Sequence, residues 1–125
     1  TVLAAGVVPA RMAGLDALVL AALRQLARQD WRTPFREKSL AAATGLSTGH
    51  LDRLFVRQLG LTPRAYLQKR RLESAVATLA DSTVPAKKIA YDLGFSSASH
   101  FTHWVRRATG KSPREISRPA RRPAA

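Results

Sequence analysis

The chain contains an internal repeat, and this repeat limits the possible folds more than any other feature of the sequence. The segment GLSTGHLDRLFVRQLGLTPRAY (45–66) aligns with GFSSASHFTHWVRRATGKSPREI (94–116), with one extra residue after Ser96 in the second copy. Each copy has a glycine, a serine, an amphipathic stretch, a second glycine and a Ser/Thr-Pro pair. Glycine commonly ends helices, and serine or threonine commonly caps their starts. Each copy therefore predicts two helices joined by a tight turn, the helix-turn-helix arrangement.

Hydrophobic periodicity predicts an all-α fold of about seven helices with short connections. Strand signals, which are period-2 alternation and β-branched clusters, are missing from the sequence. Apolar residues from Leu15 to Leu26, including Leu18, follow the spacing of one helix face. We expect helices over 15–29, 39–44, 48–59, 63–80 and 85–93, then one capped by Ser96 or Ser97 that runs to about Thr109, and one over 113–118.

The two copies of the repeat predict two helix-turn-helix units, with the long helix 63–80 between them. We expect the first subdomain over 15–62, the linker helix over 63–81 and the second subdomain over 82–118. Residues 1–14 are expected to be a flexible segment or the end of a linker. Residues 119–125, rich in Arg, Pro and Ala, are expected to form a basic flexible tail.

The charge of the chain points to a polyanionic partner, either nucleic acid or an acidic membrane surface. The 125 residues carry a formal net charge of +13, and residues 53–125 hold 15 of the 21 lysines and arginines. No apolar run approaches the roughly 18 residues needed to span a bilayer. The absence of cysteine excludes disulfides and cysteine-ligated zinc, and fits a reducing cytoplasm.

The two repeated amphipathic helices each combine an apolar stripe with a small, polar or basic face. The stripes comprise Leu51, Leu54, Phe55 and Leu59 in the first helix and Phe101, Trp104, Val105 and Ala108 in the second. The opposite faces carry Gly49, Asp52, Arg53 and Val56, and Ser99, Thr102, His103 and Arg106. A helix enters the major groove only where bulk does not block it. One such helix alone is equally well a bundle helix with a solvated face, but the repeat and the charge favour DNA recognition.

The segment GFSSASHFTHWVRRATGKSP (94–113) resembles the signature of AraC/XylS-type bacterial transcription regulators. IAYDLGF just before it, and GLSTGHLDRLFVRQLGLTPRAYLQKRRLESA in the first copy, are similar to the same unit. The resemblance covers about residues 36–117. It implies a seven-helix module of two homeodomain-like subdomains whose recognition helices enter successive major-groove segments of double-stranded promoter DNA.

The resemblance also implies a biological setting. Family members mostly activate transcription with RNA polymerase in the bacterial cytoplasm, at the nucleoid, and usually carry a separate ligand-sensing or dimerisation domain. The chain is therefore expected to be the C-terminal part of a longer regulator. Two recognition helices in one chain imply an asymmetric site. The 18-residue linker helix is ~27 Å long, against ~34 Å between groove segments, which implies tilted subdomains or bent DNA.

In this family the exposed face near the start of each recognition helix contacts bases. The residues so implied are Thr48, Gly49, Asp52 and Arg53 in the first helix and Ala98, Ser99 and His103 in the second. Arg53 is expected to contact a guanine, worth ~1–3 kcal/mol of discrimination. Asp52 accepts from cytosine N4, pairs with Arg53 or deters wrong sites. His103 stands where arginine is frequent, so the second helix is expected to contribute mainly backbone and thymine-methyl contacts.

Phosphate contacts are expected from cations and from free N–H groups at helix starts. The cations are Arg57, Arg64, Lys69, Arg106, Arg107, Lys111 and Arg114, and the helix starts are at Ser47, Thr62, Ser96 and Ser112. Any single cation is equally well a solubilising surface charge. As a group they predict strongly salt-dependent affinity.

Two other binding functions remain open, and catalysis is not expected. A sequence-neutral DNA-compacting protein shares the basic charge, and a basic amphipathic helix also binds anionic membranes. No nucleophile elbow and no GxxxxGK loop occurs in the sequence. His100 and His103 lie three residues apart, but the repeat of His100 at His50 explains them better than a metal does. We expect no cofactor and no metal.

Overall fold

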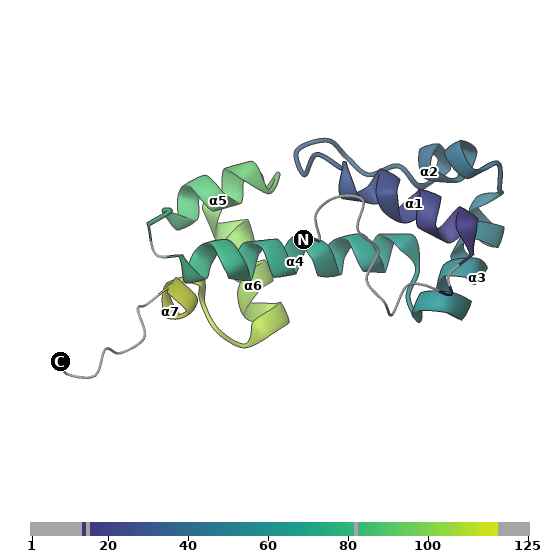
Figure 1. Cartoon of the computed structure of the whole chain (residues 1–125). Coiled ribbons are helices and arrows are strands. Elements are labelled where there is room, and N and C mark those ends of the chain that lie inside the picture. The colour runs from purple at the N-terminus through teal and green to yellow at the C-terminus, as the bar shows by residue number, and fades with distance from the viewer. Residues whose placement is uncertain (1–13, 15, 82, 118–125) are drawn as a thin grey trace. The chain divides into compact units, whose positions relative to one another are not determined.

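In the computed structural model, the described residues (14, 16–81 and 83–117) form seven α-helices and no strand. The helices are α1 (Ala17–Ala27), α2 (Glu37–Thr44), α3 (Thr48–Leu59), α4 (Pro63–Ala80), α5 (Ala86–Asp92), α6 (Ala98–Thr109) and α7 (Pro113–Ser117) (Figure 1). The predicted all-α class is confirmed. The flexible segment and the basic tail expected at the two ends lie outside the described residues, apart from Gly14.

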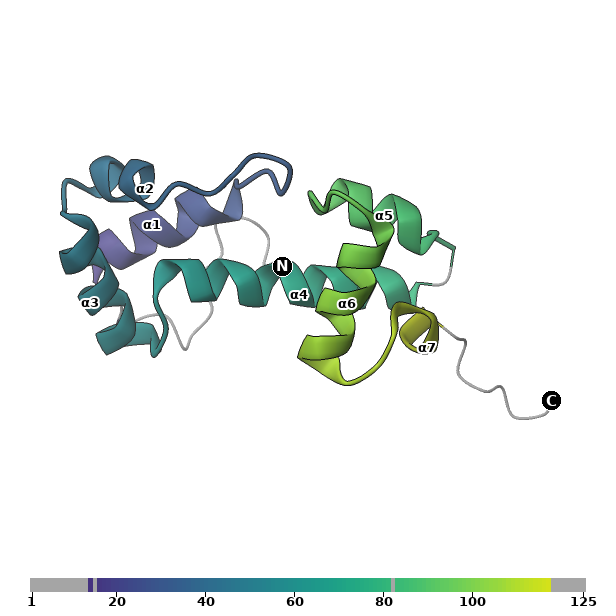
Figure 2. The ribbon, with the colours of Figure 1, turned by 180° about the vertical axis from the view of Figure 1, so that it is seen from behind.

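The chain divides into two compact units, each with its own core. The first contains α1, α2, α3 and the first two residues of α4. The second contains the rest of α4 together with α5, α6 and α7, which gather around the C-terminal half of α4 in both views (Figures 1 and 2). The second unit also includes the connector Gln29–Phe35, which the sequence-based division assigned to the first subdomain.

Helix ends agree with local chemistry, and most agree with expectation. The bounds of α3 and α4 are as predicted. α1 starts only after Asp16, because this carboxylate accepts a hydrogen bond from the Leu18 N–H at 2.7 Å and caps the helix. α2 starts at Glu37, two residues before the predicted start. It ends at Gly45, whose φ of 77° lies in the left-handed region that favours glycine.

The first core is built from one apolar face of each of its three helices. The buried residues are Val19, Ala22, Leu23 and Leu26 of α1, Leu40 and Ala41 of α2, and Leu51, Leu54 and Phe55 of α3. Leu18, expected in the buried stripe of α1, is exposed. Leu59 is only partly buried, and Leu15 lies outside the described residues. The inner face of α3 is thus fixed, so its opposite face points outward.

The second core fixes α6 in the same way. Its buried residues are Ala75 and Leu79 of α4, Ile89 and Ala90 of α5 with Leu93 at its end, and Phe101 and Val105 of α6. Trp104 is partly buried and packs against this cluster. Ala108 was expected in the stripe, but it is exposed because the stripe ends at Val105.

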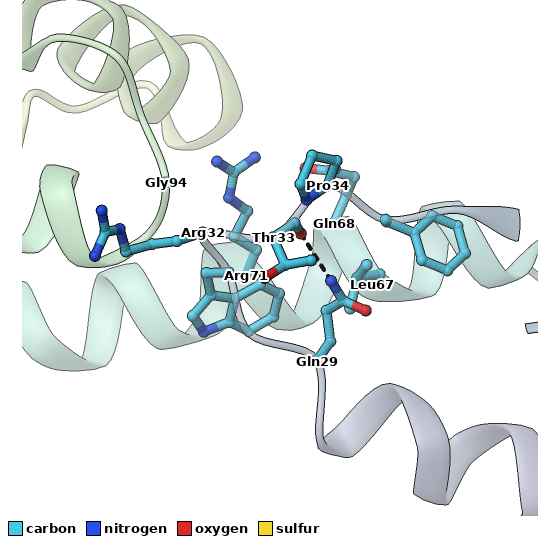
Figure 3. A pocket seen from close by; sticks show the side chains of 10 residues that line it. Gln29, Arg32, Thr33, Pro34, Leu67, Gln68, Arg71 and Gly94 are labelled. Carbon is cyan, nitrogen blue, oxygen red and sulfur yellow. Dashed lines mark hydrogen bonds between the residues drawn. The ribbon is translucent and has the colours of Figure 1, made fainter. Parts of the chain in front are cut away.

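The connector Gln29–Phe35 packs onto the turn between α5 and α6. Gly94 in that turn has φ 86°, and a Cβ there would overlap the carbonyl oxygen of Trp31. The Arg32 guanidinium lies 4.1 Å from the centroid of the Tyr91 ring. Gln29 Nε2 donates to the Thr33 carbonyl at 2.8 Å, across a cavity of about 200 Å³ (Figure 3). Position 94 therefore needs glycine for two reasons: the left-handed backbone conformation and the carbonyl oxygen of Trp31, which leaves no room for a Cβ.

Arg71 of α4 binds the same turn through the Leu93 carbonyl. Its Nε and Nη2 donate to the Leu93 carbonyl at 3.1 and 2.7 Å. The guanidinium also lies 4.1 Å from the centroid of the Phe95 ring and 5.4 Å from that of Trp104. Desolvation lowers the pKa of Arg71. These contacts tie α4 to the residues that lead into α6.

Candidate nucleic-acid interface

The outward face of α3 contains the first predicted set of base-reading residues. Ser47 caps the helix by accepting from the His50 N–H at 3.1 Å. Gly49 and Arg53 are exposed, whereas Thr48 and Asp52 are partly buried. A groove of about 400 Å³ on this face is lined by Asp52, Arg53, Val56 and Arg57. The structure thus brings Asp52 and Arg53 of the predicted set together in one groove, which Thr48 and Gly49 do not line. Val56, which the sequence placed on this face without a role in base reading, lines the same groove.

Gly49 leaves room for the side chain of Arg53. A Cβ at Gly49 would lie 3.4 Å from Arg53 Nη1, so the guanidinium folds back over the first turn of α3. Arginine carries five N–H donors in a planar fork. These donors therefore lie beside the start of the helix, which is the part that recognition helices present to bases.

Asp52 of α3 is placed against Glu37 of α2, a contact that was not expected. Glu37 Oε2 and Asp52 Oδ1 are buried, and while both carboxyl groups are ionised neither oxygen accepts a hydrogen bond from the described residues. The pKa of Glu37 is raised above 4.5, first because its protonated carboxyl donates to Asp52, then through burial and the charge of Asp52. Arg64 acts in the opposite direction. One oxygen of Asp52 is therefore buried beside Glu37, which leaves Asp52 with fewer acceptor sites for a base.

The outward face of α6 contains the second predicted set. Ala98, Ser99 and His103 are exposed and, together with Thr102 and Arg106, line a groove of about 390 Å³. Both outward faces thus combine small residues with hydrogen-bonding and cationic ones. α6 ends at Gly110, as α3 ends at Gly60, each with a left-handed φ near 80°.

The start of α6 corrects one predicted phosphate site. Ser97, not Ser96, is the cap, and its hydroxyl accepts from the His100 N–H at 3.1 Å. The pair Ser47–His50 has the same spacing and the same bond length in α3. The extra residue of the second copy therefore precedes the cap. Ser96 precedes the cap. Since only the cap residue places its side chain over the free N–H groups of the first turn, Ser96 does not cap α6.

The predicted phosphate-binding cations are all exposed, and several lie in last helical turns. Arg57 lies in the last turn of α3, and Arg106 and Arg107 lie in the last turn of α6. The remaining exposed cations of the predicted set are Arg64, Lys69, Lys111 and Arg114. Thr62 directly precedes Pro63, the first residue of α4.

Within the residues that the structure describes, none of the helices combines the length and apolar character needed to cross a bilayer.

At α7 the helix start is already occupied by the chain itself. Ser112 N–H donates to Glu115 Oε1 at 2.7 Å, and Glu115 N–H donates to Ser112 Oγ at 3.1 Å. This reciprocal pair is a capping box. A phosphate at Ser112 would have to displace the Glu115 carboxylate.

A profile of the Helix-turn-helix domain family matches residues 40–118. The HTH-type transcriptional activator RhaS of Escherichia coli is 40% identical over 78 residues, which are 62% of this chain and 28% of RhaS. The chain thus corresponds to less than a third of that relative.

Solved structures with the same fold cover most of both chains. The C-terminal domain of AraT, a response regulator from Geobacillus stearothermophilus, aligns with a TM-score of 0.75, covering 90% of this chain and 96% of that one. Its 22% identity establishes the fold alone. A probable AraC family transcriptional regulator from Rhodopseudomonas palustris is 29% identical, with a TM-score of 0.68, over 86% of this chain and 100% of its own.

Proposed function

Because the chain belongs to the AraC/XylS family of helix-turn-helix proteins, we propose that it binds specific sequences in double-stranded promoter DNA and regulates transcription, as an activator. One observation carries this proposal. α3 and α6 are capped alike and anchored alike by buried phenylalanines, and each turns hydrogen-bonding and cationic side chains outward, including Arg53 and Arg57 on α3 and His103 and Arg106 on α6. On a chain with a net charge of +13, such a pair of faces suits the major groove.

In this proposal α3 supplies most of the base recognition. Arg53 donates two hydrogen bonds to a guanine, and Thr48 and Gly49 allow close approach of the helix start. Asp52, with one oxygen buried and Glu37 beside it, contributes selectivity mainly by repelling wrong partners. The outward face of α6, formed by Ala98, Ser99 and His103, contacts thymine methyl groups and the backbone more than it discriminates bases.

The cations around these faces contact phosphates and set the affinity. They are Arg57, Arg64, Lys69, Arg106, Arg107, Lys111 and Arg114, with the start of α3 at Ser47 and that of α4 at Thr62 as further donors. Each neutralised phosphate adds about −0.9 to the slope of log K against log salt. Seven contacts correspond to a slope of about −6.

Two recognition helices in one chain imply an asymmetric site spanning successive major-groove segments. We further propose that the whole protein acts at the bacterial nucleoid and contacts RNA polymerase, and that an additional domain outside this chain senses an effector or dimerises. The similarity to 28% of RhaS supports this last point, because most of that activator lies outside the aligned segment.

Competitive binding at fixed salt tests the proposal. A site selected from randomised duplexes should bind at least ~10³-fold more tightly than unrelated DNA of equal length, as specific regulators do. Equal affinity for both duplexes would instead identify a sequence-neutral DNA-binding protein. Flotation with anionic vesicles, with both duplexes absent, serves as the control for a membrane-binding protein.

A further inference from the structure

Val56 is an exposed apolar residue in the middle of the charged face of α3. It has 49% of its surface exposed and lines the groove together with Asp52, Arg53 and Arg57. A single exposed valine is ordinary on a protein surface. The position between two arginines is what distinguishes Val56, because the equivalent position of α6 holds a cation, Arg106.

The surroundings of Val56 specify the chemistry of an occupant. Arg53 and Arg57 flank the valine and favour a polyanion, whereas the valine itself needs an apolar group. Among the base edges of the major groove, only thymine displays an apolar group, its C5 methyl. An apolar protein segment would match the valine but not the two guanidinium groups.

The register along α3 places Val56 and Arg53 on different base pairs. The two residues are three apart, which is ~4.5 Å along a helix axis, whereas base pairs are ~3.4 Å apart. The Arg53 guanidinium folds toward Gly49, away from Val56, which increases this separation.

We propose that Val56 determines specificity by contacting the C5 methyl group of a thymine, within about two base pairs of the guanine that Arg53 reads. This inference rests on the proposed DNA-binding function. It adds an apolar base contact to the first recognition helix, at a position that the sequence places on the outward face without assigning it a base contact.

Uracil substitution tests the contact, because deoxyuridine differs from thymidine in that methyl group alone. Each thymine of the selected site is replaced in turn, and Kd is measured at fixed salt for wild type, Val56→Ala and Val56→Thr. At one position uracil should weaken wild-type binding about fourfold, the value of one buried methyl group. Val56→Ala should bind thymine and uracil equally there, and Val56→Thr, which keeps one methyl group, should retain part of the preference.

Leu18→Ala is the matched control, because Leu18 is an exposed apolar residue of the same unit outside the α3 face. It should keep the full thymine preference. The inference is overturned if wild type shows no such position, or if Val56→Ala keeps the same preference. Failure of the proposed function gives a different result, since wild type would then prefer no sequence and no site would be selected.

Discussion

The side chain of Arg53 extends back over Gly49, and this conformation places the strongest hydrogen-bond donors of α3 at the start of the helix. Arg57, one turn later, is equally cationic but lies in the last turn. Two arginines on one helix are therefore expected to have different roles. Arg53 should read a base, whereas Arg57 should contact phosphate.

We predict that Arg53→Ala weakens binding to the selected site by about 1–3 kcal/mol and barely affects binding to unrelated DNA. Arg57→Ala should weaken both equally and reduce the salt slope by about 1. Titrations of both duplexes at several salt concentrations measure these effects. An equal loss on both duplexes for Arg53→Ala would make Arg53 a phosphate contact.

At the residue scale, the sequence predicts which side of a helix is exposed better than it predicts which side chains contact each other. The repeat places Gly49 and Arg53 of α3 and Ser99 and His103 of α6 on exposed faces, as the structure does, because helical periodicity determines which side of a helix is buried. Thr48 and Asp52, predicted for the same face, are partly buried. It does not reveal that Glu37 meets Asp52 or that Arg71 holds the Leu93 carbonyl, because these partners lie 15 and 22 residues apart and meet only through tertiary packing. Ser96 and Ser97 are adjacent, so sequence alone does not decide between them.

At the scale of elements, α2 and α3 are linked by the carboxyl groups of Glu37 and Asp52. The raised pKa means that folded Glu37 binds a proton more tightly than the unfolded chain does. The stabilising effect of that proton is complete below pH 4.5 and is lost as the pH rises through the folded-state pKa.

Glu37→Gln should remove the pH dependence of stability that Glu37 causes, because the amide stays neutral and donates to Asp52 at any pH. The free energy of unfolding of Glu37→Gln, relative to wild type, is predicted to increase from pH 4.5 to pH 7. Urea denaturation at several pH values measures the difference. Parallel pH profiles for the two proteins would show that the carboxyl groups do not share a proton.

The turn before α6 depends on the connector Gln29–Phe35 and on Gly94. Gly94→Ala should destabilise the protein by more than 2 kcal/mol, because a left-handed alanine costs about 1–2 kcal/mol and its Cβ also displaces Trp31. Gly110→Ala is the control, since Gly110 has φ 80° and no atom within 4 Å of its Cβ position. Thermal and urea unfolding compare the two variants, and equal losses would argue against packing of the connector on this turn.

Helix existence and type follow from the sequence, whereas some helix ends and the packing of the connector do not. Ser47 and Gly60 mark the two ends of α3 and Pro63 marks the start of α4, so the sequence predicts these ends. The start of α2 lacks a side-chain cap at Arg36, so no residue marks it. Trp31 and Arg32 pack with the second unit because of Gly94 and Tyr91, more than fifty residues later, which periodicity does not reveal.

At the scale of the whole molecule, we propose that the two corresponding helices, α3 and α6, act on one DNA molecule. The duplication of caps and buried phenylalanines is the reason for proposing that each unit binds DNA. The differences between the faces, Arg53 and Val56 against His103 and Arg106, mean that the two units do not read the same sequence. A site bound by both is therefore expected to have two unlike halves.

Selection from fully randomised duplexes, followed by sequencing of the enriched pool, tests this claim most directly. The predicted result is one asymmetric motif with two blocks about one helical turn apart, the more sharply defined block containing a guanine and a nearby thymine. A pool that resembles the input, or a motif that is palindromic or has a single block, would contradict it.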